Sequence, residues 1–183
     1  FPDLLSFDAV DYFINITHEQ YYRHFKEYFG NTIKGIFTDE PSIGYCCNNS
    51  SVPYYEQLPD DYKSLCGDDF YDDMELGRDK FYETVMVAVA NRFKACYVDK
   101  IRNWCEEHSI DMCGHMMNDH EPCGATRNNG NLLTMLSSFS IAGVDEINTN
   151  LNDSTLLSLF GAAQYARKGN YAMAELFALG PCD

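Results

Sequence analysis

Two long stretches of the chain place apolar residues at steps of three and four, the spacing of one face of a helix. In residues 8–29 this face consists of Val10, Phe13, Ile14, Thr17, Tyr21, Phe25 and Phe29. In residues 79–108 it includes Phe81, Val85, Val89, Phe93, Ile101, Trp104 and Cys105. We predict an amphipathic helix over each stretch. Ser6 or Asp8 is expected to cap the first helix and Gly30 to end it.

Four short β-prone segments alternate with helical patterns along the rest of the chain. The segments are residues 33–41, 110–117, 144–148 and 171–177, and shorter helices are expected at 132–139 and 156–167. The order is therefore a helix, then strand and helix three times, then a strand. Such alternation predicts a parallel sheet with helical crossovers.

A doubly wound sheet and a (β/α) barrel both fit this order of elements. The chain has no glycine-rich phosphate loop, which weakens the nucleotide-binding version of the doubly wound sheet. Each expected strand ends in polar residues, and barrel enzymes build their active sites from such strand ends. We therefore predict an α/β fold of the (β/α)8 TIM-barrel type.

An acidic insertion, residues 45–77, interrupts this pattern. It holds eight acidic residues against Lys63 alone, nearly half of the chain's net charge of -15. Pro53, Pro59 and Gly67 predict a long loop with short helical turns, placed at the mouth of the site. Asp68, Asp69, Asp72 and Asp73 could ligate a hard cation, but the EF-hand spacing is absent and a solvated acidic loop is the simpler interpretation.

The overall composition narrows the class of protein. The 183 residues are 45% hydrophobic and 14% aromatic, enough for a packed core. An acidic chain is a poor partner for nucleic acid, and no apolar run approaches the roughly 18 residues of a membrane span. Several of the eight cysteines fall in apolar helix or strand positions, which favours reduced thiols and a cytoplasmic over a secreted protein.

Two glutamates at expected strand ends suggest the chemistry. Glu40 lies in the run Thr38-Asp39-Glu40-Pro41, and Glu175 lies in an otherwise apolar strand. A pair of carboxylates suits glycoside hydrolysis, in which one donates a proton to the leaving oxygen and the other acts as base or nucleophile. We predict Glu40 and Glu175 as the catalytic residues.

Further polar residues at strand ends are candidates for contacts with a substrate. They are Asp39, His115, Glu121 and Asp145. Asp145 and Glu146 project to opposite faces of their strand, so that one of the two faces the site. His115 could equally be a buried core histidine, and Trp104 is most simply a core residue. No metal-ligand spacing is recognisable, so the metal, if any, is left open.

Several of these segments resemble the catalytic barrel of the family 106, α-L-rhamnosidase-like glycoside hydrolases. The resemblance lies in residues 11–22 (DYFINITHEQYY), 28–30 (YFG), 33–41 (IKGIFTDEP) and Gly114-His115. It implies a glycosidase with an acid/base pair of glutamates, a glycoside or oligosaccharide substrate and an association with calcium. Members of that family are much larger, which implies that residues 1–183 form part of a barrel, from the helix before the fourth strand to just after the seventh. The remaining barrel strands, or a homodimer partner, would then be needed.

The chain also departs from the broader group of retaining barrel glycosidases, which it resembles in strand spacing. That group has an Asn before the acid/base, whereas this chain has Asp39, so retention or inversion stays open. Two other functions also stay open. One is a metal-dependent barrel hydrolase or isomerase with Asp39, His115, Asp119 and Glu121 as ligands, and the other is a non-catalytic carbohydrate-binding barrel fragment.

Overall fold

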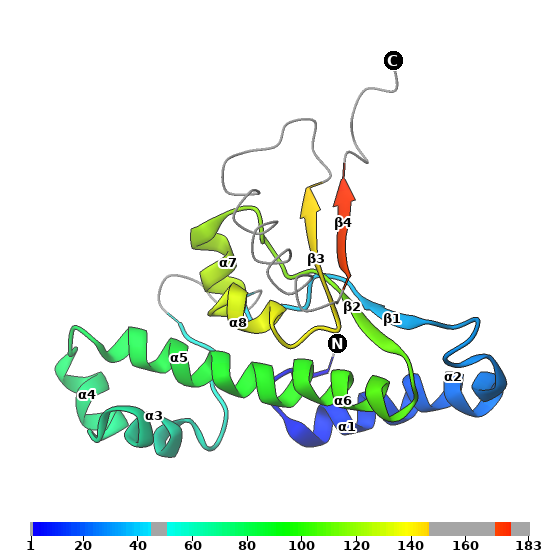
Figure 1. The fold of residues 1–183 in the computed structure, drawn as a ribbon. Coiled ribbons are helices and arrows are strands. Elements are labelled where there is room, and N and C mark those ends of the chain that lie inside the picture. Colours follow the sequence, from blue (N-terminus) through cyan, green and yellow to red (C-terminus); the bar gives the residue numbers. More distant parts are fainter. Residues whose placement is uncertain (1, 45–50, 147–170, 177–183) are drawn as a thin grey trace.

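A computed structural model describes residues 2–44, 51–146 and 171–176. Within them, four strands form one parallel sheet: β1 (Gly35–Thr38), β2 (Asp111–Gly114), β3 (Ile141–Glu146) and β4 (Ala172–Leu176) (Figure 1). The spatial order is β1-β2-β3-β4, the same as the order along the chain. The predicted mixed α/β fold with a parallel sheet is therefore confirmed, and all four strands lie within or overlap the segments expected from the sequence.

The register of the sheet divides its side chains between two faces. Phe37 pairs with Cys113, Cys113 pairs with Ile141, and Asp145 pairs with Glu175. These residues alternate with Met112, Ala142 and Val144, which are buried in the core. Because side chains alternate along a strand, one face packs into the core and the other carries Asp145 and Glu175.

The first predicted helix is broken into two by Thr17. Helix α1 (Phe7–Ile16) is followed by α2 (His18–Phe25) and a short 3-10 turn, η1 (Lys26–Tyr28). The Thr17 hydroxyl donates to the carbonyl of Phe13 and so competes with the helical backbone bonds at the break. Ser6 caps α1 as expected, its hydroxyl accepting from the amide of Ala9.

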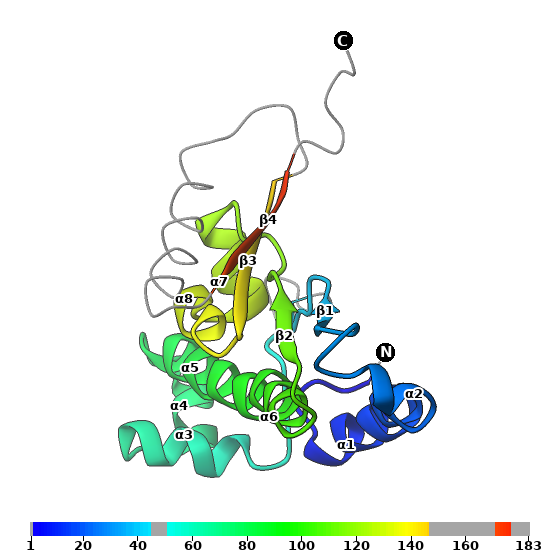
Figure 2. The same ribbon diagram turned by 45° about the vertical axis from the view of Figure 1, so that its right-hand side comes forward.

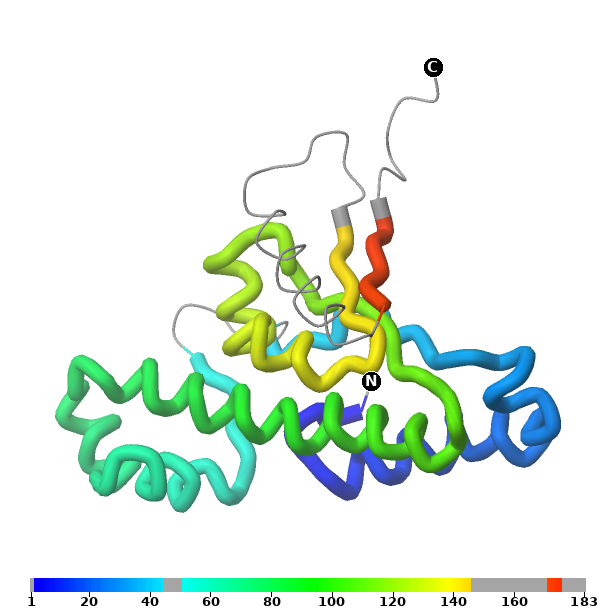
Figure 3. Tube along the Cα trace, in the orientation of Figure 1, coloured from blue at the N-terminus to red at the C-terminus, as the bar shows by residue number. Residues whose placement is uncertain are grey.

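The second predicted helix is one continuous run containing a π-helical segment. Helix α5 (Phe81–Phe93) passes into the π-helix η2 (Lys94–Val98) and then into α6 (Asp99–Glu107). Figure 3 traces this run below the sheet, with α1 beside the α6 end and α3 and α4 beside the α5 end. Trp104 is buried in α6, where its ring stacks on His108, as expected of a core residue.

The described part of the acidic insertion contains two helices that lie away from the strand ends, which corrects the prediction of a loop with short helical turns for these residues. Helices α3 (Leu58–Cys66) and α4 (Phe70–Leu76) pack against α5 (Figure 1). The buried Tyr62 hydroxyl donates to the Asp73 carboxylate at 2.8 Å, which joins the two helices. The acidic side chains therefore decorate a small helical unit with its own apolar contacts.

Two further helices connect β2 to β3. Helix α7 (Pro122–Asn129) was not expected from the sequence, whereas α8 (Leu132–Leu136) falls within the predicted range 132–139. Figure 2 shows both beside β3. The helix expected at 156–167 lies outside the described residues. No helix in the described part of the chain is long and apolar enough to span a membrane.

Candidate active site

The carboxyl end of β1 is held against the helices by one buried hydrogen bond. The Thr38 and Tyr97 hydroxyls lie 2.8 Å apart, and Tyr97 comes from the π-helix η2. Such π-helical segments are common at functional sites because they reposition side chains. This contact fixes the strand at the point where Asp39 and Glu40 leave it.

Glu40 has a strained backbone. Its φ is +46°, in the left-handed region that non-glycine residues rarely adopt, although it precedes Pro41, which favours extended conformations. Conformations of this kind cost about 1–3 kcal/mol and cluster at functional sites. The half-buried Glu40 side chain lies close to His115 and Asp145 at the ends of the neighbouring strands.

His115 lies at the centre of the strand ends and is 1% exposed. Its Nε2 lies 3.3 Å from Oε2 of Glu175 and 3.6 Å from Oδ1 of Asp39. An ionised carboxylate only accepts hydrogen bonds, so Nε2 carries the proton in the contact with Glu175. The other ring nitrogen, Nδ1, is buried without a hydrogen-bond partner.

Asp145 is held in place through its backbone. Its amide donates to Oδ2 of the buried Asp119 at 3.0 Å. Its own Oδ1 is buried without a hydrogen-bond partner. One oxygen of Asp145, one oxygen of Glu40 and one ring nitrogen of His115 all lie within 4.8 Å of one another. The strand ends therefore gather two carboxylates around a buried imidazole, and Glu175 contacts the same ring.

Burial and like charges favour the protonated forms of two of these carboxylates. Burial is the largest cause that raises the pKa of Glu40, His115 opposes it, and the charges of Asp145 and Asp39 add to it. Burial likewise raises the pKa of Asp145, again opposed by His115 and reinforced by Glu175. A carboxyl group that keeps its proton near neutral pH can act as a general acid.

The structure brings together five of the six predicted site residues. Asp39, Glu40, His115, Asp145 and Glu175 interact as described above. The sixth, Glu121, is exposed at the start of α7, and its described contacts are with the neighbouring turn and its own helix. The backbone carbonyl of Glu121 accepts a hydrogen bond in the first turn of α7, whereas its side chain does not cap the helix.

Several contributors to the site were missed or given little weight in the sequence analysis. Tyr97 looked like one more apolar residue of a helical face, and nothing in the sequence marks the π-helical segment that positions it. Asp119 is expected from the sequence only as a ligand of the alternative metal enzyme, and His120 is not among the predicted site residues. The charge of His120 lowers the pKa of both Glu40 and Asp145, and Asp119 supports the Asp145 backbone.

The cluster is a poor match for calcium, the metal that the family resemblance implies. Calcium takes six to eight oxygen ligands, whereas the group formed by Glu40, His115 and Asp145 includes an imidazole. Imidazole with carboxylates suits zinc, iron or manganese better. We therefore derive no catalytic step through calcium.

A second group, Cys66, Asp68 and Asp73, also lies within 4.8 Å in the acidic unit. Asp73 is already engaged by Tyr62 and by Arg78 at 3.3 Å, and the cysteine is a soft ligand among hard ones. Asp69 instead caps α4, accepting from the amides of Tyr71 and Asp72. These contacts give the acidic residues structural roles.

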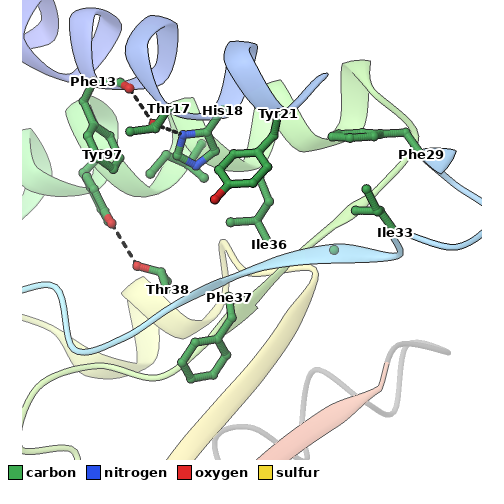
Figure 4. Close-up of a pocket in the computed structure, with 12 residues that line it drawn as sticks. Phe13, Thr17, His18, Tyr21, Phe29, Ile33, Ile36, Phe37, Thr38 and Tyr97 are labelled. Atoms are coloured by element: carbon green, nitrogen blue, oxygen red, sulfur yellow. Dashed lines mark hydrogen bonds between the residues drawn. The ribbon is translucent and has the colours of Figure 1, made fainter. Parts of the chain in front are cut away.

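A pocket of about 330 Å³ lies between α1, α2 and β1 (Figure 4). Its lining is mostly apolar and includes Phe13, Tyr21, Ile36 and Ile101, and it contains none of the six predicted site residues. Figure 4 shows the Phe37 ring on the side of β1 opposite Ile36 and Tyr21. Phe37 is also among the lining residues and contacts His115, whereas none of the carboxylates of the cluster lines the pocket.

Comparison with known proteins identifies a fold but no family. No family model and no curated protein matches the chain. Among solved structures, the chain is similar to a rhamnosidase from Novosphingobium sp. PP1Y, with a TM-score of 0.71 over 94% of this chain and 15% sequence identity. The chain spans 17% of that rhamnosidase chain. The likeness shows a shared fold, and the family 106 resemblance stays a prediction.

Proposed function

We propose that the chain contributes the catalytic carboxylates of a (β/α)-barrel glycoside hydrolase. The observation that carries this proposal is the convergence of Glu40, after β1, and Glu175, on β4, around the buried imidazole of His115. Carboxylates on two sides of one small site are what glycosidic bond cleavage requires. A rhamnosidase of the same fold supports the choice of reaction and suggests rhamnosides as substrates to test first.

The sheet topology supports the barrel. Its strands follow chain order without reversal, whereas the order reverses at the ligand-binding crevice of a doubly wound sheet. Sequential parallel strands with right-handed crossovers place their connections on one face, as in a barrel. The other face then carries the catalytic residues at the carboxyl ends of the strands. Closure would need further strands, from the rest of a longer polypeptide or from a second copy.

In this proposal Glu40 is the general acid and Glu175 the base or nucleophile. Burial raises the pKa of Glu40, which favours the protonated form that a general acid needs. Glu175 accepts the hydrogen bond from Nε2 of His115, which orients its carboxylate toward the sugar. Asp39 and Asp145, on either side, would bind sugar hydroxyls.

A panel of p-nitrophenyl glycosides, including the α-L-rhamnopyranoside, tests the proposal on the full chain. Glu40→Gln and Glu175→Gln should each lower kcat/KM on the preferred glycoside by at least about 100-fold, because a positioned acid or base contributes about 10²–10⁴-fold. Glu27→Gln, an exposed change in η1, is the control and should leave the rate unchanged. Turnover that survives both active-site changes would refute the assignment.

The imidazole in the cluster also supports a second candidate, a metal-dependent hydrolase. Its ligands would be Glu40, His115 and Asp145, and not Asp119 and Glu121, because Asp119 contacts the Asp145 backbone and Glu121 is exposed on α7. Dialysis against a chelator distinguishes the two candidates. Loss of turnover that returns with a divalent ion would favour the metal enzyme, and unchanged turnover would favour the carboxylate pair. A carbohydrate-binding barrel would bind the sugar without turnover.

A further inference from the structure

We propose that Phe37 contacts the substrate, its ring packing against the apolar C–H face of a pyranose that the Glu40, His115 and Glu175 side chains hold by its polar groups. This inference rests on the proposed function and adds to it a residue that determines which sugar binds. No sequence pattern singled out Phe37, which reads as an ordinary residue of a β-prone run.

The sheet register places Phe37 on the same face as the catalytic cluster. It pairs with Cys113, and Glu175 pairs with Asp145 further along the same face. The side chains of the flanking Ile36 and Thr38 project from the opposite side of β1, where the Thr38 hydroxyl bonds that of Tyr97 (Figure 4). Within β1, Phe37 is thus the residue whose side chain lies on the face of the catalytic cluster.

The ring of Phe37 touches the cluster directly. Its centroid lies 5.5 Å from that of the His115 ring, at an interplanar angle of 65°. This edge-type contact is favourable between aromatic rings and fixes Phe37 beside the imidazole. The imidazole in turn contacts Glu175 and Asp39. The aromatic ring and the carboxylates therefore share one small site.

The ring of Phe37 is partly accessible. It lies on β1, the edge strand of the described sheet, and is 48% exposed among the described residues. His115 beside it is almost fully buried. One part of the Phe37 ring is thus packed against His115, while the rest is accessible to a ligand.

The combination matches the chemistry of a sugar ring. A pyranose presents hydroxyl groups around its edge and a patch of C–H groups on its face. Carboxylates and an imidazole bind the hydroxyl groups, while an aromatic ring buries the C–H patch with little loss of side-chain entropy. A phosphate, which carries negative charge and has no C–H face, would gain nothing from the Phe37 ring.

Kinetics of Phe37 variants on the aryl glycoside with the highest turnover test the proposal. We expect Phe37→Ala to raise KM about tenfold while kcat changes less than about threefold, because lost ground-state binding appears in KM. Phe37→Tyr, which keeps the ring, should stay within about threefold of wild type. Phe25→Ala is the matched control, since Phe25 is 44% exposed on α2.

Calorimetric titration with the free monosaccharide separates this inference from the proposed function. If Glu40→Gln abolishes turnover while Phe37→Ala changes neither KM nor sugar affinity, Phe37 does not contact the substrate, although the function stands. If the chain binds the sugar in a Phe37-dependent way but turns nothing over, the hydrolase proposal is wrong and the contact stands. If no sugar binds and no glycoside is cleaved, both are overturned. Near-ultraviolet circular dichroism of Phe37→Ala and Phe37→Leu shows whether each variant folds.

Discussion

Nε2 of His115 lies 3.3 Å from Oε2 of Glu175, across sixty positions of sequence and across an intervening strand. His115 follows β2 and Glu175 belongs to β4, so the contact passes over β3. Gly143 of β3 makes this close packing possible, because a side chain there would meet the Gly114 carbonyl at 2.6 Å. The contact between His115 and Glu175 therefore depends on the correct packing of β2, β3 and β4.

Loss of this contact should impair catalysis. We expect His115→Ala to lower kcat by about 10- to 100-fold, since a hydrogen bond to a charged group is worth about 1.5–3 kcal/mol. His115→Gln keeps an N–H donor and should lose less. Steady-state kinetics on the preferred aryl glycoside measures both. An Ala variant with wild-type kcat would show that the imidazole does not orient Glu175.

The contact between Thr38 and Tyr97 should contribute measurably to stability. Tyr97→Phe and Thr38→Val each remove one hydroxyl of a buried pair, and we expect each to cost about 1 kcal/mol of unfolding free energy. A double-mutant cycle in urea should return a coupling of at least about 0.5 kcal/mol. Additive effects would mean that the two hydroxyls do not depend on each other.

Glycine at position 114 should be required for both conformation and space. Its φ is +143°, and an added Cβ would collide with the Thr38 carbonyl. We expect Gly114→Ala to destabilise the fold by about 3 kcal/mol, through overpacking and backbone strain together. Gly67→Ala is the control, because its φ of +88° is similarly unfavourable but open space surrounds it, and its cost should be about 1 kcal/mol. If chemical denaturation gave the same loss of unfolding free energy for Gly114→Ala and Gly67→Ala, the proposed collision would be contradicted.

The raised pKa of Asp145 predicts a pH-dependent effect of its removal. Burial raises this pKa above the unfolded value of about 3.9, so the folded state loses stability as the pH rises through the folded pKa. Asp145→Asn removes that loss. The variant should have a higher melting temperature than wild type at pH 7, and this gain should shrink toward pH 4. The exposed Asp79→Asn is the control, and a gain that is equal at both pH values would contradict the account.

Periodicity and strand-end polarity predicted the four strands, the two long amphipathic stretches and most of the site. These features depend on local patterns, because a residue's face on a strand or helix follows from its position along that element. The convergence of Glu40, His115, Asp145 and Glu175 followed from placing all strand ends on one edge of a parallel sheet.

Features that depend on tertiary packing were not predictable. The break at Thr17 and the π-helical segment at Tyr97 arise from side-chain contacts that leave no periodic signal. Helix α7 lacks an apolar stripe and is not predicted from the sequence, so Glu121 at its start looks like a residue at the end of the preceding strand. The acidic insertion is predicted as a loop because its many charged residues obscure the short apolar pattern to which Tyr62 and Phe70 belong. These two rings pack against each other in the structure.

The most direct test of the central claim is how each glutamate variant responds to the leaving group. A good leaving group such as 2,4-dinitrophenolate needs little protonation, so removing the general acid should matter less on its glycoside than on an alkyl glycoside. We predict that the factor by which Glu40→Gln lowers kcat/KM is at least about tenfold smaller on the dinitrophenyl glycoside than on the methyl glycoside. Glu175→Gln should lower kcat/KM by similar factors on both glycosides. The reverse pattern, or two variants that cleave both glycosides at the wild-type rate, would contradict Glu40 as the acid and Glu175 as its partner.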